Sequence, residues 1–262
     1  MPAEPLRNKT AVVTGSSSGI GRSIALALAE AGANVVLHGR SPSKHIDAVA
    51  SEVLAFGVKS TNLFADFAGD PSWEAFVGQA WEWNDGVDIW INNAGGDVLT
   101  GQWKDESLEN KLDYLFQVDV KATLMLSREI GKRMAAGESV VPGSASIINI
   151  GWDQAAQGMA GESGELFAAT KGAIMAMTKS LAQSLAPGVR VNCIAPGWIQ
   201  TSWGENASES WQQRAHQDAL MGRWGKPEDV AAAAVFLASE QSSFISGQVI
   251  PVNGGFRYAG GS

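Results

Sequence analysis

Short apolar runs alternate along this chain with longer segments in which apolar side chains recur at helical spacing. Continuous apolar runs are typical of strands that are buried on both faces of a parallel sheet. Strands that alternate with helices predict such a sheet, covered by helices on both faces. The pattern predicts strands at 10–14, 34–38, 59–65, 87–91, 146–150, 190–194 and 248–252, and helices over 19–31, 43–55, 71–83, 108–134, 164–185 and onward from residue 227.

Glycine and proline mark the ends of several of these elements. Gly32 and Gly57 follow predicted helices and can end them, and Pro71 is expected in the first turn of its helix. Residues 136–145 are expected to form a surface loop, whereas 197–222 show no clear period. The 262 residues contain no internal repeat and no linker. The expected fold is therefore a single α/β domain over 1–262, a Rossmann-type doubly wound parallel sheet.

Composition excludes several classes of protein. Hydrophobic residues make up 45% of the chain and charged residues 18%, which excludes a disordered or fibrous protein. The formal charge is −8 and Lys and Arg form no run, so binding to nucleic acid or to an anionic membrane is not expected. The histidines, His38, His45 and His216, are scattered without metal-ligand spacing and are expected to be structural or surface residues, so no metal site is expected.

Three features favour a cytoplasmic location. Cys193 is the single cysteine, which excludes an internal disulfide and suits a reducing compartment. Residues 1–5 have neither the basic nor the apolar region of a signal peptide. No apolar stretch reaches the roughly 18 residues of a membrane span. We therefore expect a cytoplasmic protein.

A glycine-rich segment, Thr14-Gly15-Ser16-Ser17-Ser18-Gly19-Ile20-Gly21, follows the first predicted strand and opens the first predicted helix. A pyrophosphate needs backbone N–H donors at a helix N-terminus with no side chains in the way. Gly15 permits the tight turn, Gly19 lets the backbone approach the phosphates, and Gly21 permits close packing of helix on strand. The alternative is a serine-rich turn that only caps the helix, but the position between strand and helix favours nucleotide binding.

This segment resembles the TGxxxGIG motif of the short-chain dehydrogenase/reductase family. Further segments resemble motifs of that family in the same order, so the resemblance covers nearly the whole chain. It implies a Rossmann-type fold and a nicotinamide dinucleotide cofactor. The further segments are Asn92-Asn93-Ala94-Gly95, Lys171 at the lysine of the YxxxK motif, Pro196-Gly197 with Thr201, residues 222–231, and Gly247-Gln248 with Val252-Asn253-Gly254-Gly255.

The cofactor is expected to be NADP(H) rather than NAD(H). In NAD-binding folds an acidic side chain at the end of the second strand holds the ribose diol, but residues 38–41 contain none. Arg40 could instead contact a 2′-phosphate, the alternative being a solvated surface arginine. Asp66 and Phe67 would flank the adenine by resemblance, although Asp66 could equally cap its own turn. The expected cofactor contacts are Gly15, Ser17, Ser18, Gly19, Ile20, Gly21, Arg40, Ser41, Asp66, Phe67, Asn93, Ala94, Gly95, Lys171, Pro196, Gly197, Ile199 and Thr201.

The residues that move the proton in this family are largely replaced. By resemblance, a tyrosine hydroxyl exchanges the proton, a lysine four residues later lowers its pKa, a serine binds the substrate oxygen and an asparagine supports a water relay. Here Phe167 stands at the tyrosine position, Trp152 at the serine position and Asp119 at the asparagine position, and only Lys171 is kept. The chain therefore resembles a divergent member without the catalytic serine and tyrosine. Its two tyrosines, neither followed by a lysine at four residues, are Tyr114 and Tyr258.

A substitute proton donor has to come from another residue. Carboxylic acids whose pKa is raised by burial can act as general acids, and the candidates are Asp119, Asp153, Glu162 and Glu165. Structural alternatives stand beside these roles. Asp119 could form an ion pair, Asp153 could cap a loop, and Glu165 could simply favour the positive end of its helix dipole.

Four tryptophans fall in segments that this fold places around the nicotinamide end of the cofactor. Residues 197–222 resemble the family's mobile substrate lid. Aromatic faces there suit a flat or apolar small-molecule substrate, the alternative being packing within the lid or between subunits. The four are Trp152, Trp198, Trp203 and Trp211.

Three hypotheses for function follow. The first is an NADP(H)-dependent oxidoreductase that acts on a carbonyl or alcohol with a proton donor other than tyrosine. The second is a catalytically inactive NADP(H)-binding homologue that senses the cofactor or supports a partner subunit. The third is altered acid–base chemistry, such as dehydration or isomerisation. The resemblance also implies a homo-oligomer, a tetramer or dimer, built through the two long helices and the C-terminal strand region.

Overall fold

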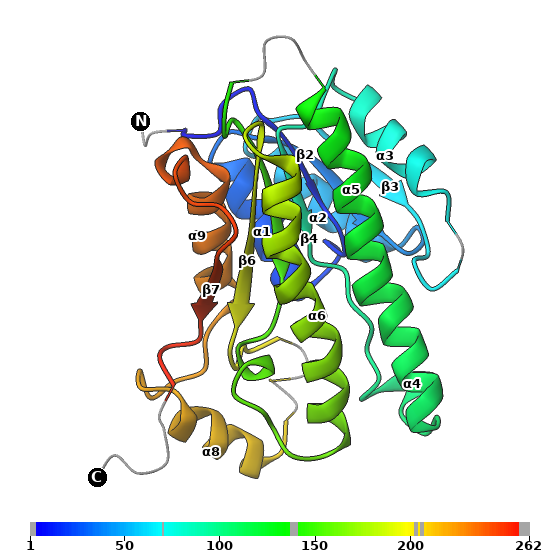
Figure 1. Cartoon of the computed structure of the whole chain (residues 1–262), viewed down its shortest axis with the longest axis vertical. Coiled ribbons are helices and arrows are strands. Elements are labelled where there is room, and N and C mark those ends of the chain that lie inside the picture. Colours follow the sequence, from blue (N-terminus) through cyan, green and yellow to red (C-terminus); the bar gives the residue numbers. More distant parts are fainter. Residues whose placement is uncertain (1–3, 70, 137–140, 202–203, 205–206, 257–262) are drawn as a thin grey trace.

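A seven-stranded parallel sheet forms the centre of the protein (Figure 1), as the sequence predicts. The computed structural model describes residues 4–69, 71–136, 141–201, 204 and 207–256. The strands lie in the order β3-β2-β1-β4-β5-β6-β7. The second and third are added to one side of β1 and the others to its opposite side, so the connections after β1 and β4 diverge and leave a crevice at the carboxyl ends of these two strands. The strands are β1 (Thr10–Val13), β2 (Asn34–Gly39), β3 (Ser60–Phe64), β4 (Ile89–Asn92), β5 (Ala145–Ile150), β6 (Val189–Pro196) and β7 (Val249–Val252).

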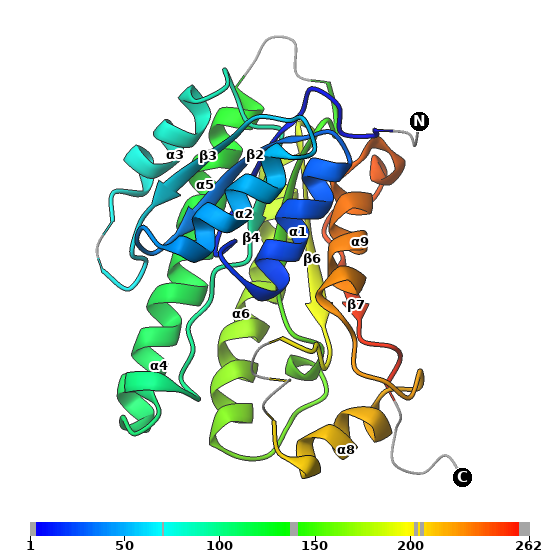
Figure 2. The same cartoon turned by 180° about the vertical axis from the view of Figure 1, so that it is seen from behind.

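Helices cover both faces of this sheet. Successive side chains of β1 point to opposite faces, so Ala11 and Val13 join one buried apolar cluster and Val12 joins another. The first cluster lies under α1 (Gly19–Glu30), α2 (Lys44–Leu54) and α9 (Pro227–Ala238), which are in front in Figure 2. The second lies under α3 (Trp73–Glu82), α5 (Ala122–Ala135) and α6 (Glu162–Leu185), which are in front in Figure 1.

The long helix predicted over 108–134 is present but is not regular throughout. It consists of α4 (Leu108–Leu115), a π-helical segment (Phe116–Lys121) and α5. A π-helical turn holds one residue more than the regular bond pattern allows, and such turns are frequent at functional sites. Asp119 lies in this segment, where its Oδ1 accepts a hydrogen bond from the Gly96 N–H at 2.7 Å. The apolar period of the sequence carries no signal for this turn.

Two other elements differ from the expectation. The helix predicted to begin with Pro71 in its first turn begins at Trp73, because Ser72 is its N-cap and accepts a hydrogen bond from the Ala75 N–H at 3.2 Å. Within 197–222, where no period is visible, α8 (Glu209–Asp218) forms a short helix.

In the part of the chain that the structure describes, no helix is both long and apolar enough to span a membrane.

Candidate active site

The glycine-rich turn between β1 and α1 is pressed against the loop that follows β4. Gly15 and Gly19 have φ of 64° and 54°, a conformation that favours glycine. A Cβ on Gly15 would lie 2.8 Å from Ala94 Cα, and one on Gly21 would lie 2.3 Å from Asn93 Nδ2. Since no side chain fits at these points, the turn leaves a bare cradle of backbone at the N-terminus of α1. Such a cradle fits the pyrophosphate of a dinucleotide.

A buried histidine connects this turn to the end of β3 through hydrogen bonds. The N–H of Gly15 donates to His38 Nδ1 at 3.0 Å, and His38 Nε2 lies 3.0 Å from the carbonyl oxygen of Ala65. The imidazole also stacks on Phe67, with 4.4 Å between ring centroids. Burial lowers the pKa of His38 to about 4, so the ring is neutral at pH 7, accepts at Nδ1 and donates at Nε2. His38 is therefore structural.

A cavity of about 420 Å³ runs from the turn to the end of β2 and across to the loop after β4. Most of the residues expected from the sequence to bind the cofactor line this cavity. Gly19 and Ser41 are not part of its lining. Tyr114, which the sequence analysis does not place at the cofactor, is part of it. The expected residues along it are Gly15, Ser17, Ser18, Ile20, Gly21, Arg40, Asp66, Phe67, Asn93, Ala94, Gly95 and Thr201.

Arg40 lies at the end of this cavity where the adenosine ribose would be held. Its side chain is exposed and directly follows β2. The positive charge is close enough to Tyr114 to act against the burial that raises the pKa of that phenol. Asp66 lines the same end, and its Oδ1 accepts the N–H of Ala68 at 3.0 Å, so it also caps its own turn. A phosphate at this end would meet a guanidinium.

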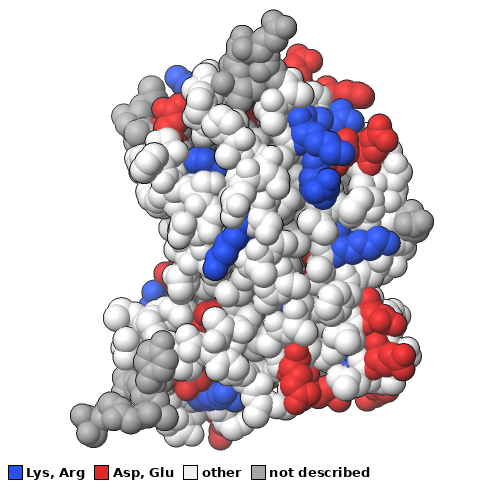
Figure 3. Space-filling model, viewed as in Figure 1, with Lys and Arg blue, Asp and Glu red and all other residues white. Residues whose placement is uncertain are grey.

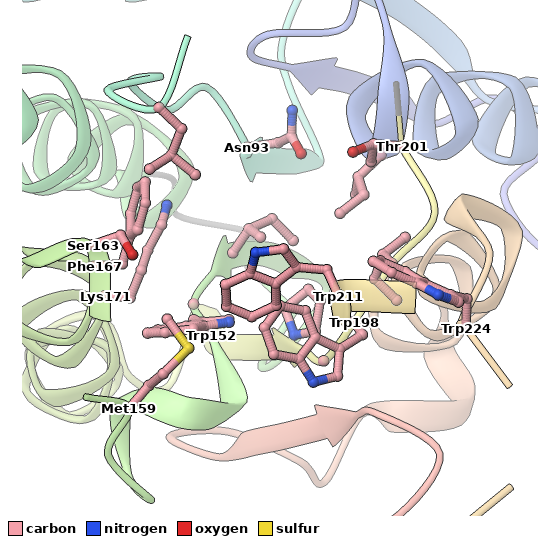
Figure 4. A pocket seen from close by; sticks show the side chains of 17 residues that line it. Asn93, Trp152, Met159, Ser163, Phe167, Lys171, Trp198, Thr201, Trp211 and Trp224 are labelled. Carbon is pink, nitrogen blue, oxygen red and sulfur yellow. The ribbon is translucent and has the colours of Figure 1, made fainter. Parts of the chain in front are cut away.

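A second cavity, of about 540 Å³, continues from the first (Figure 4). The two share Ile20, Asn93 and Thr201 in their linings. Besides these three, four further residues expected to contact the cofactor line this second cavity, which is where a nicotinamide would be expected; they are Lys171, Pro196, Gly197 and Ile199. Its remaining walls are largely aromatic and apolar; they include Leu99, Ile150, Trp152, Met159, Phe167, Trp198, Trp211 and Trp224.

One face of α6 presents Ser163, Phe167 and Lys171 to this cavity at intervals of four residues (Figure 4). Lys171 Nζ lies 2.9 Å from Asp119 Oδ2, and the Asp119 side chain is fully buried. Asp119 therefore forms an ion pair, which is the structural role that the sequence analysis gives as the alternative to proton donation. Ser163 was missed by the sequence reasoning, although its spacing from Phe167 is a signal that could have found it. It places a hydroxyl in the cavity one helical turn away from Phe167.

The rings of Trp152 and Phe167 lie beside each other at the wall of this cavity. Trp152 follows β5 and Phe167 lies on α6, and their rings meet edge to face with 6.3 Å between centroids. An indole N–H and a phenyl ring cannot exchange a proton with a substrate near neutral pH. Among the described residues that line the cavity, Lys171 carries the one charged group.

The candidate carboxylates lie outside the cavity lining. Asp153 is buried directly behind Gly197, where a Cβ would lie 3.2 Å from Asp153 Oδ2. The same oxygen accepts a hydrogen bond from Asn253 Nδ2 at 3.0 Å, and burial raises the pKa of Asp153. Glu165 is exposed, so the structure does not bring it to the reacting atoms as the sequence reasoning suggests. Glu162 points elsewhere and pairs with Lys111 at 2.7 Å.

Tryptophans from the segment expected to form a lid enclose the far side of the cavity. Trp198 packs against Trp211 and Trp224, with 5.2 Å and 6.1 Å between centroids. The Arg214 guanidinium lies 5.7 Å above the Trp198 ring and 5.2 Å above the Trp211 ring. Trp152, Trp198 and Trp211 thus lie around the cavity as expected, and Trp224 joins them. Trp203 lies outside the described residues.

Comparison with known proteins agrees with this geometry. A family model described as enoyl-(acyl carrier protein) reductase matches residues 15–257. The chain belongs to the short-chain dehydrogenase/reductase family. This short-chain dehydrogenase/reductase is 35% identical to the 3-oxoacyl-(acyl-carrier-protein) reductase FabG of Aquifex aeolicus, over 95% of this chain and 98% of that protein. The relatives that it matches are named as reductases.

Solved structures share the whole fold. One is a 3-oxoacyl (acyl-carrier-protein) reductase of Agrobacterium tumefaciens C58 with NADP bound, which has a TM-score of 0.84 and 31% identity over 97% of this chain and 96% of that one. Another is a 7α-hydroxysteroid dehydrogenase complexed with NADH and 7-oxo glycochenodeoxycholic acid, with a TM-score of 0.85 and 29% identity over 97% and 96%. These structures hold different nicotinamide cofactors, so the preference of this chain has to be argued from its own residues.

Proposed function

We propose that this short-chain dehydrogenase/reductase transfers a hydride between NADP(H) and a carbonyl or alcohol substrate, with a proton donor other than tyrosine. The bound cofactor supplies or takes the hydride. The observation that carries the proposal is the junction of the two cavities. The bare glycine cradle opens into one cavity, and Ile20, Asn93 and Thr201 join this to the aromatic cavity that Lys171 lines. A substrate in the second cavity therefore lies beside the nicotinamide end of a cofactor in the first.

Arg40 supports NADP(H) as the cofactor. A guanidinium at the end of β2 can donate charge-assisted hydrogen bonds to a 2′-phosphate, and no carboxylate in 38–41 is available to the ribose diol of NAD(H). We expect NADPH to bind at least roughly tenfold more tightly than NADH, since hydrogen bonds to charged groups contribute about 1.5–3 kcal/mol.

The test of this preference is the change Arg40→Asp, with dissociation constants measured by calorimetry. It should weaken NADPH binding and leave NADH equal or favoured. The control Arg128→Asp makes the same charge change at an exposed position of α5 and should not alter the preference. Equal affinities for the two cofactors, unaffected by Arg40→Asp, would refute the assignment.

Lys171 is the proton donor that the site favours for a carbonyl substrate. Its ammonium group lines the cavity, and its Nζ lies 2.9 Å from Oδ2 of the buried Asp119. Ser163 offers a hydroxyl that can orient the substrate oxygen. No other described residue that lines the cavity, Trp152 and Phe167 included, has an ionisable side chain.

Single-turnover kinetics separate proton donation from cofactor binding. Lys171→Met should lower the rate of ketone reduction at saturating NADPH by about 10²–10⁴, the usual contribution of a general acid. If Lys171 only holds the nicotinamide ribose, the variant will bind NADPH more weakly while the rate at saturation stays the same. Asp119→Asn should reduce the rate less, because the ammonium group remains.

One observation favours a second candidate, a catalytically inactive NADP(H)-binding homologue. Trp152 and Phe167 replace with rings the two hydroxyls that the family motif would supply. Such a protein would bind NADPH and reduce no member of a ketone panel. In that case, the double change Phe167→Tyr with Trp152→Ser should create reductase activity from none. Dehydration is not favoured, since no described carboxylate lines the cavity.

We also propose a cytoplasmic homo-oligomer. Phe116 and Met125 are exposed along the helix that contains α4 and α5, and Phe244 is exposed shortly before β7. Figure 3 shows that the neighbouring surface over α6 is largely uncharged. Exposed apolar area of this kind marks interfaces. Sedimentation should give the mass of a dimer or tetramer, and Phe116→Glu with Met125→Glu should lower the mass of the particle in solution.

The free, buried thiol of Cys193 supports the cytoplasmic location, because it suits a reducing compartment.

A further inference from the structure

Two features of the aromatic cavity favour a positively charged substrate over a neutral ketone. The cavity lacks a hydroxyl where a substrate oxygen would take up its proton, and its walls are rings with carboxylates behind or beside them. We propose that this cavity binds organic cations and that the protein also reduces iminium ions, the nitrogen analogues of carbonyl compounds. This further activity rests on the proposed NADP(H) site.

Aromatic rings cluster along the walls of this cavity. Trp198 lies at the centre of the cluster, against Trp211 and Trp224, and Trp152 meets Phe167 on the opposite wall (Figure 4). The face of an aromatic ring carries partial negative charge and attracts cations, most strongly in tryptophan. Indole faces on opposite walls of one cavity therefore offer a positively charged, flat substrate several favourable contacts at once.

The structure already contains a cation against two of these rings, from a residue outside the cavity lining. The Arg214 guanidinium lies over both Trp198 and Trp211, so these rings have the geometry for cation–π contact. Trp198 Nε1 also donates to Asp218 Oδ2 at 3.3 Å. A hydrogen bond from the indole N–H to a carboxylate increases the electron density of the ring, which strengthens its attraction for a cation.

The charges around the cavity leave one buried carboxyl without a cationic partner. Lys171 is paired with Asp119, and Arg214 is paired with Asp218. Asp153 is different: it has no ion pair in the described part of the chain, and its Oδ1 has no hydrogen-bond partner there. It lies behind Gly197, which lines the cavity. A cation in the cavity would stabilise the charged form of this buried carboxyl.

The chemistry of an iminium ion removes the need for the missing hydroxyls. Reduction of a ketone creates an alkoxide, and a positioned acid usually contributes about 10²–10⁴ to that step. When a hydride from NADPH adds to an iminium carbon, its electron pair forms the new C–H bond. The π electrons of C=N⁺ move to nitrogen, and the products are a neutral amine and NADP⁺. Because no proton is consumed, the rings of Trp152 and Phe167 do not slow this step.

Binding can be measured without any turnover. N-methyl-3,4-dihydroisoquinolinium and 1-tetralone have the same bicyclic frame, but one is a permanent cation and the other a neutral ketone. Calorimetry on the cofactor-free protein should give roughly tenfold tighter binding of the cation, within the range of cation–π contacts. Trp211→Leu should reduce this advantage, and the matched change Trp211→Phe, which keeps a ring face, should reduce it less. Asp153→Asn should weaken binding of the cation more than that of the ketone.

Turnover is then measured as NADPH oxidation by the same two compounds, corrected for the reaction without protein. We expect kcat/KM for the iminium to exceed that for 1-tetralone by at least about 100-fold, the low end of the contribution of a general acid. The double change Phe167→Tyr with Trp152→Ser should narrow this ratio by raising ketone reduction.

The outcomes separate this inference from the proposed function. Tighter binding and faster reduction of the iminium support it. If 1-tetralone binds as tightly and is reduced as fast, the inference is overturned while the proposed carbonyl reduction stands. If NADPH binds and neither compound is reduced, both are overturned in favour of the inactive homologue.

Discussion

Protonation of His38 should destabilise the protein in a defined pH range. Its ring holds the glycine turn by accepting the N–H of Gly15 and donating to the carbonyl of Ala65. Burial lowers its pKa to about 4, whereas an unfolded chain titrates near the ordinary value of 6.5. The folded state therefore favours the neutral ring. The stability that this group contributes is complete well above pH 6.5 and is lost as the pH falls from about 6.5 towards 4.

The expected size follows from the two pKa values. Between pH 7 and pH 5 the unfolded chain takes up most of a proton at this position and the folded protein takes up little. The free energy of unfolding should therefore fall by about 2 kcal/mol from this residue alone. His38→Asn keeps an acceptor for the Gly15 N–H but cannot titrate. It should be less stable than the wild type at pH 7 and should lose about 2 kcal/mol less between pH 7 and pH 5.

Urea unfolding followed by tryptophan emission at the two pH values measures this difference. His45→Asn is the matched control, because His45 is exposed on α2; its pH dependence should follow the wild type. If His38→Asn shows the same pH dependence as the wild type, the ring is not held neutral in the fold and the account of the turn is wrong.

Other predictions concern the cradle, the cavity and the sheet. Gly21→Ala places a Cβ 2.3 Å from Asn93 Nδ2, so thermal unfolding should show a loss of about 2 kcal/mol and titration should show at least roughly tenfold weaker NADPH binding. Ser163→Ala should raise the KM of a ketone substrate more than it lowers NADPH affinity. Arg190, buried at the start of β6, donates to the carbonyls of Gly143 and Leu237; Arg190→Met should cost about 3 kcal/mol in urea unfolding by leaving acceptors unpaired.

The order and type of the elements could be predicted because each has a local signal. The apolar runs of β1 and β4 become fully buried strands, as their composition indicates. Gly32 and Gly57 end their helices with φ of 95° and 81°, a conformation that other residues rarely adopt. The glycine-rich turn was also predictable, because its residues are consecutive in the sequence.

Features that depend on contacts between distant segments could not be predicted in this way. The π-helical segment that contains Asp119 has the same apolar period as a regular helix. The pairing of Asp119 with Lys171 joins two helices, and either residue alone is compatible with several roles. Tyr114 and Trp224 line the two cavities because of how the long helix and the segment before α9 fold back on the sheet. The exposure of Glu165 depends on the rotation of α6, which its sequence specifies only approximately.

The central claim is that the glycine turn binds a nicotinamide dinucleotide whose reacting end lies beside the tryptophan cavity. Energy transfer from indole to bound NADPH tests it most directly, because Trp152 and Trp198 line the cavity next to that end. Excitation of tryptophan should give NADPH emission that saturates with added cofactor, is displaced by NADP⁺ and is weakened by Gly21→Ala. Absence of saturable energy transfer with NADPH, together with no calorimetric binding of NADPH or NADH, would contradict the account.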